Sequence, residues 1–260
     1  TIKYLLQYYE KKIQIVLIFI FYNLYHSLCN TFTFAKMNNK IVITNDGSHS
    51  IFNPEINETY HSKHGAIVEA EHVFIKNGFS KANKNELNIL EIGFGTGLNA
   101  LLTSQKAVQK SITVNYHTME LYPVPKENYT QLNFTDLIGL EKESLLNLHE
   151  TPWEEEYKIN EFFTLNKSKS DLENYTSNTK FDIIYFDAFS PEKQPELWTE
   201  IIFKKMYNYL KEDGFLVTYC AKGVVKRTMK AVGFDVIALD GPPGKRQMTR
   251  ADKNTTPSQK

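Results

Sequence analysis

The sequence predicts an α/β fold, in which helices cover both faces of a mainly parallel sheet. Short apolar runs alternate with segments of helical spacing over most of the chain. One of these runs stops at a cluster of alternating glycines, and a helix-forming segment follows, which is the order of a strand, a turn and a helix. Strands separated by helices imply right-handed crossovers and therefore parallel pairing.

The composition is that of one ordinary globular domain. Of the 260 residues, 42% are hydrophobic and 23% are charged, which excludes disordered, collagen-like and membrane-embedded chains. The two cysteines, Cys29 and Cys220, form neither a metal-binding pair nor a disulfide framework. This cysteine usage fits a reducing compartment, so we expect a cytoplasmic protein without a metal site.

Residues 1–36 differ from the rest of the chain. Two lysines precede an apolar run over residues 13–21, an arrangement that resembles a signal peptide. The run is shorter than the ~20 residues that span a bilayer, and no small-residue cleavage site follows it. Met37 then begins a segment that predicts a strand and a turn at residues 46–47. We interpret residues 1–36 as upstream translation or a non-native extension, with a membrane anchor or export signal as the alternative.

The rest of the chain predicts one domain over residues 37–252 and a polar tail over residues 253–260. A first helix is expected over residues 62–78, ended by Gly78, and a loop over residues 81–86. Strands are predicted over residues 87–92, 112–120, 158–165, 181–187, 215–220 and 234–239. Helices are predicted from residue 98, over residues 129–140 and 141–148, over residues 195–210 with Gly214 ending that helix, and up to Gly233.

The glycine cluster reads Glu91-Ile92-Gly93-Phe94-Gly95-Thr96-Gly97-Leu98-Asn99. Glycines without Cβ atoms let the backbone turn tightly and approach a ligand, and the following helix N-terminus offers free N–H groups. A turn of this kind is also common in plain connections between a strand and a helix. The alternating spacing and the acid that ends the strand resemble the first motif of S-adenosylmethionine (SAM)-dependent methyltransferases.

Glu120 ends the next predicted strand, 23 positions beyond Gly97. In folds with such a turn, an acid at this place binds both hydroxyls of a ribose. The alternative is a solvated charge at the end of a strand. The strand and turn before it favour the ribose interpretation.

Asp187 follows the buried-type strand over residues 181–187, and Ala188, Phe189, Ser190 and Pro191 come after it. Ligands of open α/β sheets lie beyond the carboxyl ends of the strands, so Asp187 is expected to face the reacting group. The acid–small–aromatic–x–Pro pattern resembles the Asp/Asn-Pro-Pro-aromatic motif of amino-group methyltransferases. The alternative is an ordinary turn that the carboxylate caps.

The formal net charge of zero hides an uneven distribution. Residues 37–221 have a balance of −9, whereas residues 222–260 carry nine basic and three acidic side chains. A basic end of this kind could bind a polyanion such as RNA, or it could consist of solvated charges.

Several flanking segments complete a more specific pattern. In chain order with the motifs above, they closely resemble the methyltransferase half of the bacterial tRNA 5-methylaminomethyl-2-thiouridine biosynthesis (MnmC-type) family over roughly residues 46–252. The segments are D-G-S-H-S at 46–50, Y-H-S-K-H-G-A at 60–66, K-Q-P-E-L-W at 193–198, T-Y-C-A-K-G at 218–223 and G-P-P-G-K-R at 241–246. Because the sequence ends at Lys260, we expect the stand-alone form without the FAD-dependent oxidase half.

This resemblance implies a Rossmann-like SAM-dependent methyltransferase fold and methylation of the aminomethyl group of a tRNA wobble uridine. It implies Asp187 as the catalytic residue and tRNA as the partner. The residues expected to bind SAM are Glu91, Gly93, Gly95, Gly97, Leu98, Asn99 and Glu120. The residues expected to bind the substrate are Tyr60, Phe189, Pro191, Lys222, Lys245 and Arg246.

Two points depart from the simplest picture. Residues 166–168, Asn-Lys-Ser, stand where many methyltransferases carry an acid near the adenine. His61 and His64 also precede a helix near the expected site, and we interpret them as structural rather than catalytic.

Two other functions stay open: a small-molecule amine methyltransferase or polyamine synthase relative, and a non-catalytic RNA-binding protein with the same fold.

Overall fold

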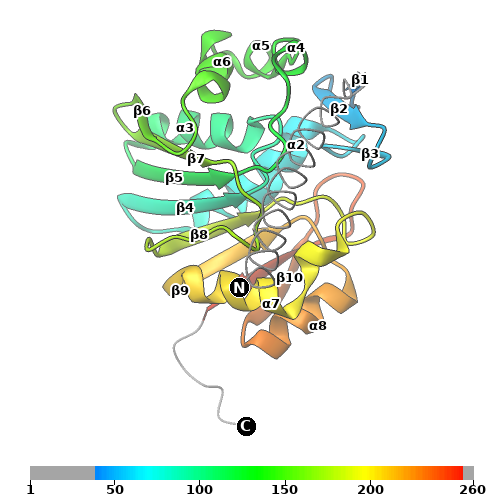
Figure 1. Ribbon diagram of the computed structural model, residues 1–260, viewed down its shortest axis with the longest axis vertical. Coiled ribbons are helices and arrows are strands. Elements are labelled where there is room, and N and C mark those ends of the chain that lie inside the picture. Colours follow the sequence, from blue (N-terminus) through cyan, green and yellow to red (C-terminus); the bar gives the residue numbers. More distant parts are fainter. Residues whose placement is uncertain (1–38, 254–260) are drawn as a thin grey trace, which may run out of the picture. The chain divides into compact units, whose positions relative to one another are not determined.

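The computed structural model describes residues 39–253 (Figure 1). Residues 1–36, which we interpret as upstream translation or a non-native extension, lie outside the described residues, and so does most of the polar tail. No helix in the described range is long and apolar enough to cross a membrane. A three-stranded antiparallel sheet, β1-β2-β3, precedes an eight-stranded sheet with the order β10-β11-β9-β8-β4-β5-β7-β6.

The strands are β1 (Lys40–Ile43), β2 (His49–Asn53), β3 (Glu58–Thr59), β4 (Glu86–Ile92), β5 (Thr113–Met119), β6 (Glu156–Asn160), β7 (Phe163–Ser168), β8 (Phe181–Phe186), β9 (Leu210–Thr218), β10 (Asp235–Asp240) and β11 (Gln247–Asp252). The helices are α2 (Ala66–Ala70), η1 (Glu71–Lys76), η2 (Phe79–Lys81), α3 (Leu98–Lys110), α4 (Lys126–Tyr129), α5 (Phe134–Ile138), α6 (Glu143–Glu150), η3 (Pro195–Trp198), α7 (Glu200–Tyr209) and α8 (Gly223–Val232).

The five central strands, β7-β5-β4-β8-β9, are parallel. The chain runs outward from β4 to β5 and β7, then returns to the other side of β4 to form β8 and β9. The order of the strands therefore reverses between β4 and β8, and the carboxyl ends of these two strands border the crevice where open α/β sheets bind ligands.

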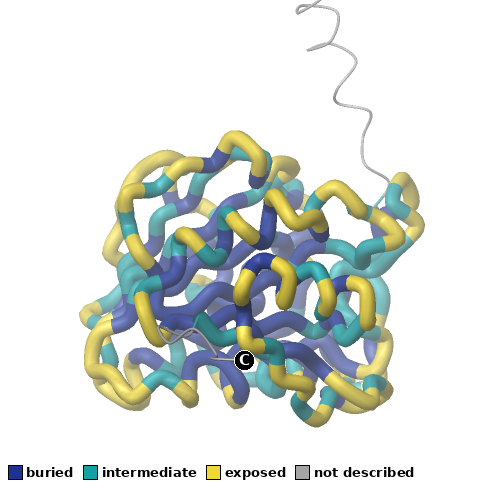
Figure 2. Tube along the Cα trace, turned by 90° about the horizontal axis from the view of Figure 1, so that it is seen from below, coloured by how far each residue is buried: buried dark blue, intermediate teal, exposed yellow. Residues whose placement is uncertain are grey.

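Helices cover both faces of the sheet, as the sequence predicts. Strand β8 is buried along its whole length, because its side chains alternate between two cores. Ile183 and Tyr185 belong to the core that includes residues of η1 and α3, whereas Ile184 and Phe186 belong to the core that includes residues of α7 and α8. Figure 2 shows the strands as the buried interior of the described chain.

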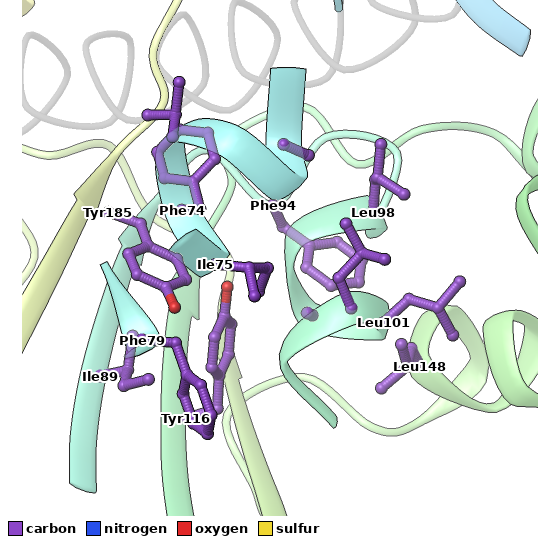
Figure 3. Packing of buried hydrophobic residues seen from close by; sticks show 14 of the residues in the cluster. Phe74, Ile75, Phe79, Ile89, Phe94, Leu98, Leu101, Tyr116, Leu148 and Tyr185 are labelled. Carbon is purple, nitrogen blue, oxygen red and sulfur yellow. The ribbon is translucent and has the colours of Figure 1, made fainter. Parts of the chain in front are cut away.

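Aromatic rings fill the core on the η1 and α3 side (Figure 3). The ring centroids of Tyr116 on β5 and Tyr185 on β8 lie 6.1 Å apart, and that of Phe74 on η1 lies 5.2 Å from Tyr185. Glu91 on β4 is fully buried and pairs in register with Tyr185 and with Thr118. A stripe of buried polar groups thus crosses three strands just below the carboxyl ends of β4 and β8.

The boundaries of three expected helices are wrong. The helix expected over residues 129–140 is divided, since α4 ends at Tyr129 and α5 begins at Phe134. The helix expected over residues 62–78 begins at Ala66, because Gly65 precedes it with φ 146°, and it continues as the π-helix η1. The helix expected over residues 195–210 is divided at Thr199, which is extended and whose side chain accepts a hydrogen bond from Ile202 N–H. Gly214 does not end this helix but lies inside β9.

Two features of the sheet differ from the expected strands. The single strand expected over residues 158–165 is a hairpin, β6 and β7, whose turn is fixed by a 2.9 Å hydrogen bond from Phe162 N to Asn160 Oδ1. Strand β11 was not predicted, and it pairs antiparallel with both β9 and β10. Its sequence, Gln-Met-Thr-Arg-Ala-Asp, has only two apolar residues, so hydrophobic pattern gives little signal.

Candidate active site

The glycine turn packs between the ends of three parallel strands. Gly93 has φ +89°, and a Cβ atom there would lie 2.9 Å from the carbonyl oxygen of Asp187. The N–H groups of Gly93 and Phe94 both donate to the carbonyl of Met119 at 3.1 Å. Only glycine meets both requirements at position 93, so the turn is built to pass close to the end of β8.

Helix α3 begins directly after the turn. Gly97 is its N-cap with φ +75°, and no side chain caps the helix. Free N–H groups at such a helix start bind anionic or polar ligand groups. The side chain of Leu98 is 1% exposed and belongs to the core, so this residue can offer a ligand only its backbone.

Glu120 lies immediately after β5 and faces the glycine turn. Its Oε2 accepts a hydrogen bond from Gly95 N at 3.1 Å, and its Oε1 accepts one from Tyr122 N at 2.9 Å. Burial raises the pKa of this carboxyl group, while the backbone hydrogen bonds act in the opposite direction. The predicted ribose-binding acid is therefore held in a fixed orientation beside the predicted cofactor turn.

Asp187 follows β8, and its N–H donates to Ile92 O at 3.1 Å. Its Oδ2 accepts a 2.8 Å hydrogen bond from Asn99 Nδ2. Burial, with repulsion from Glu69, raises the pKa of Asp187 to about 7, while the Asn99 hydrogen bond and the Lys245 charge oppose this shift. A carboxyl group with this pKa exchanges a proton readily at neutral pH, as a general base or acid must.

Two aromatic residues, Tyr60 and Phe189, form a wall beside the glycine turn. The rings of Tyr60 and Phe189 meet edge to face with centroids 5.0 Å apart. A Cβ atom on Gly95 would lie 3.1 Å from Tyr60 Cδ1, so the ring contacts the glycine turn. The backbone of Phe189 is held by Trp198, whose Nε1 donates to its carbonyl at 2.9 Å. Pro191 lies half-buried in the same loop.

The three basic residues expected at the substrate are in different environments. Lys245 forms an ion pair with Glu69, and its Nζ lies 4.0 Å from the ring centre of Tyr219. Lys222 is more exposed and pairs with Glu192. Arg246 is exposed and makes no ion pair with any residue in the described range. Lys245 is therefore part of the site wall, whereas the other two face outward.

Two histidines form hydrogen bonds with Thr96 in the glycine turn. The sequence singled out only one of them, His61. His61 Nε2 lies 2.7 Å from Thr96 Oγ1, and His149 Nε2 lies 3.0 Å from the carbonyl oxygen of Thr96. Burial lowers the pKa of both rings to about 4, so both are neutral at physiological pH. His64 is exposed. The geometry agrees with a structural role for His61. Nothing in the local sequence marks His149, which comes from α6.

Lys167 is a fully buried lysine on β7, in the segment expected near an adenine. Its Nζ donates to the carbonyl oxygens of Leu148 at 2.8 Å and His149 at 2.7 Å, near the end of α6. It also lies 4.7 Å from the ring centre of Trp153. An ammonium group at this place donates hydrogen bonds to the last carbonyl groups of α6, so Lys167 stabilises the end of this helix.

We expect Lys167 to make the stability of the fold depend on pH. Burial lowers its pKa from 10.5 to about 8. Between these values the unfolded chain binds more protons than the folded chain, so the free energy of unfolding rises with pH. In urea denaturation at about pH 7 and about pH 9.5, wild type should gain stability relative to Lys167→Met. A constant difference between the two proteins would show that this pKa shift is absent.

Comparisons with known proteins show which families the chain resembles. Residues 151–254 match a family described as S-adenosyl-L-methionine-dependent methyltransferase. The chain is 30% identical over 229 residues to the tRNA 5-methylaminomethyl-2-thiouridine biosynthesis bifunctional protein MnmC of Cupriavidus metallidurans, covering 81% of this chain and 33% of that protein. It is also 30% identical over 229 residues to the Burkholderia pseudomallei protein of the same name, covering 80% of this chain and 34% of that protein.

Among solved structures, MNMC2 from Aquifex aeolicus is similar with a TM-score of 0.67 and 26% identity, over 86% of this chain and 72% of that one. The chain spans about a third of the length of the two bifunctional relatives. The similarity therefore concerns one part of those proteins.

Proposed function

We propose that the chain is an S-adenosyl-L-methionine-dependent methyltransferase that methylates the aminomethyl group on the wobble uridine of tRNA. The methylated product would be methylaminomethyluridine. The relatives whose names include this tRNA modification support the choice of substrate. A tRNA substrate implies a cytoplasmic protein, so the proposal includes this location.

The observation that carries the proposal is the position of Asp187. Asp187 directly follows β8, its backbone lies against Gly93 of the glycine turn, and its carboxylate accepts a hydrogen bond from Asn99. A proton acceptor two residues before the aromatic side chain of Phe189 fits an amine that must lose a proton as it is methylated. The small-molecule amine alternative shares this feature, so a test has to compare both substrates.

The residues around the turn fit SAM. Glycines occupy the positions where a Cβ would meet Asp187 or Tyr60, the start of α3 has no side-chain cap, and Glu120 presents a carboxylate beside Gly95. Glu120 would accept hydrogen bonds from the ribose hydroxyls, and the start of α3 would bind the polar end of the cofactor. When bound, SAM supplies a methyl group attached to a positively charged sulfur.

SAM held there would transfer its methyl group to the nitrogen of a neutral primary amine, and S-adenosylhomocysteine would be the leaving group. Asp187 would orient the amine and take up the proton that the nitrogen loses. Most of the rate enhancement would come from holding nitrogen, carbon and sulfur in line, which the wall of Tyr60 and Phe189 supports.

We expect the basic residues 222, 245 and 246 to help hold tRNA. Neutralising Lys222, Lys245 and Arg246 together should weaken tRNA binding, and the weakening should shrink as salt rises, because phosphate contacts act through counterion release. SAM affinity should change little. Filter binding across a salt series measures the effect.

A matched control removes three other exposed lysines, Lys81, Lys110 and Lys180, by substitution with glutamine. Lys81 and Lys180 precede β4 and β8, and Lys110 ends α3, so all three lie at the opposite edge of the parallel sheet. This variant loses the same positive charge and should bind tRNA like wild type. Equal binding by the two triple variants at every salt concentration would contradict docking at the basic end.

The proposed function is tested by methyl transfer from labelled SAM to undermodified tRNA and to free primary amines. We expect label in tRNA, and none in tRNA that already carries the methylated nucleoside. Transfer to free amines but not to tRNA would favour the small-molecule alternative. Binding of tRNA without transfer to either substrate would favour the non-catalytic alternative.

A further inference from the structure

Asn99 links the catalytic carboxylate to the buried stripe of polar groups. It lies in the first turn of α3 and is 3% exposed. Its Nδ2 makes the 2.8 Å hydrogen bond to Asp187 Oδ2, whereas its Oδ1 is buried without a hydrogen-bond partner in the described chain. A buried amide oxygen without a donor is costly, so a proton donor is expected next to it.

Glu91 is the group next to Asn99. Its carboxyl group is completely buried on β4 and interacts with the Asn99 side chain. Oε2 accepts a 2.8 Å hydrogen bond from Thr118 Oγ1, but Oε1 has no partner among the described residues. Glu91 Oε1 and Asn99 Oδ1 thus both lack a partner in the same buried stripe of the described chain, as do the hydroxyl groups of Tyr116 and Tyr185 beside Glu91.

We propose that Asn99 is a positioning residue for Asp187, and that a protonated Glu91 orients Asn99 by donating a hydrogen bond to its Oδ1. One proton on Glu91 Oε1 would give that oxygen and Asn99 Oδ1 a partner. The chain of hydrogen bonds then runs from Glu91 through the Asn99 amide to Asp187. This inference rests on the proposed function, because it assigns a task to Asn99 through Asp187.

The surroundings favour a neutral Glu91. Burial raises its pKa well above the ordinary value, and Asp187 adds like-charge repulsion, whereas the hydrogen bond from Thr118 acts in the opposite direction. The other titratable neighbours are Tyr116 and Tyr185, and Tyr185 pairs in register with Glu91 from β8. Both tyrosines are held neutral by burial. A neutral acid can donate to Asn99, whereas a carboxylate could only accept.

The charged groups that face Asp187 come from several elements. Glu69 on α2 raises its pKa, and Lys245 in the turn between β10 and β11 lowers it. Glu91 on β4, Tyr116 on β5 and Tyr219 after β9 are the other titratable neighbours. Asn99 makes the one side-chain hydrogen bond to the carboxylate in the described chain. Loss of this bond should therefore raise the pKa of Asp187 and allow its side chain to move.

The first experiment measures kcat against pH for methyl transfer to undermodified tRNA. Asn99→Ala should lower kcat at neutral pH by ~10-fold and move the midpoint of the profile upward by ~1 pH unit. SAM affinity, measured by calorimetry, should stay within ~3-fold, because the lost contact is to Asp187. The matched control is Gln105→Ala, which removes another side-chain amide of α3, one that donates to Ile138 O at 3.1 Å, and should leave the midpoint unchanged.

The second experiment tests Glu91 by conservative rescue. Glu91→Leu should lower kcat about as much as Asn99→Ala, whereas Glu91→Gln, a neutral group that can still donate, should recover most of the loss. The inference is overturned if Asn99→Ala keeps the wild-type midpoint, or if Glu91→Gln is no better than Glu91→Leu. Failure of the proposed function would give a different result from failure of this inference. In that case Asp187→Ala would remain active, or wild type would not methylate tRNA. Circular dichroism and Glu91→Gln keep the test valid if Glu91→Leu does not fold.

Discussion

Replacing Asp187 with alanine is expected to lower the rate of methyl transfer at saturating SAM by ~10²-fold or more. The partner of this carboxylate in the proposed reaction is the reacting amine, so cofactor affinity should change much less than turnover. Single-turnover assays with undermodified tRNA measure the rate, and calorimetry measures the affinity. Asp187→Asn is the matched variant, since it keeps the size of the side chain but cannot accept the proton.

Near-normal turnover by either variant, with an intact fold, would remove Asp187 from the reaction. The wild-type pH profile gives a second test. Because the pKa of Asp187 is about 7, its carboxylate form increases as pH rises through neutrality. The rate should therefore rise with pH in this range, and this part of the pH dependence should be missing in Asp187→Asn.

Replacing Glu120 with alanine is expected to weaken SAM binding by ~1.5–3 kcal/mol, the range for hydrogen bonds to a charged group. The structure gives Glu120 a fixed orientation through Gly95 N and Tyr122 N, so the wild-type side chain needs little rearrangement to bind a ribose. Part of the loss would come from the Gly95 N–H group, which would also lose its acceptor.

Calorimetric titration with SAM measures this loss. The matched control is Glu127→Ala, which removes an exposed acid from the first turn of α4 and should leave the affinity unchanged. Glu120→Gln should fall between wild type and Glu120→Ala, because an amide still provides one acceptor oxygen. Wild-type affinity in Glu120→Ala would contradict the ribose assignment.

The parallel core and the centre of the site could be predicted from the sequence because their signals are local. An apolar strand, alternating glycines and a strand-end acid lie close together along the chain. The rule that ligands bind beyond the carboxyl ends of parallel strands then brings Asp187 to Glu91 and Gly93 without any further information. The structure brings these groups together, and a Cβ atom on Gly93 would lie 2.9 Å from the carbonyl oxygen of Asp187.

The parts that could not be predicted depend on contacts between distant segments. Lys245 pairs with Glu69 from a segment 176 positions away, and His149 reaches Thr96 across 53 positions. Strand β11 has a weak hydrophobic pattern and is fixed by its neighbours on both sides. The sequence also could not indicate that Asn99 bonds to Asp187, because its motif suggested only a role in cofactor binding.

The central claim, methylation of a tRNA wobble nucleoside, is tested most directly by mass spectrometry of tRNA nucleosides from cells that lack this gene. The account predicts loss of methylaminomethyluridine and accumulation of its aminomethyl precursor. It also predicts that a plasmid with the wild-type gene restores the methylated nucleoside and that one with Asp187→Ala does not. Normal levels of methylaminomethyluridine in cells without the gene would contradict the account.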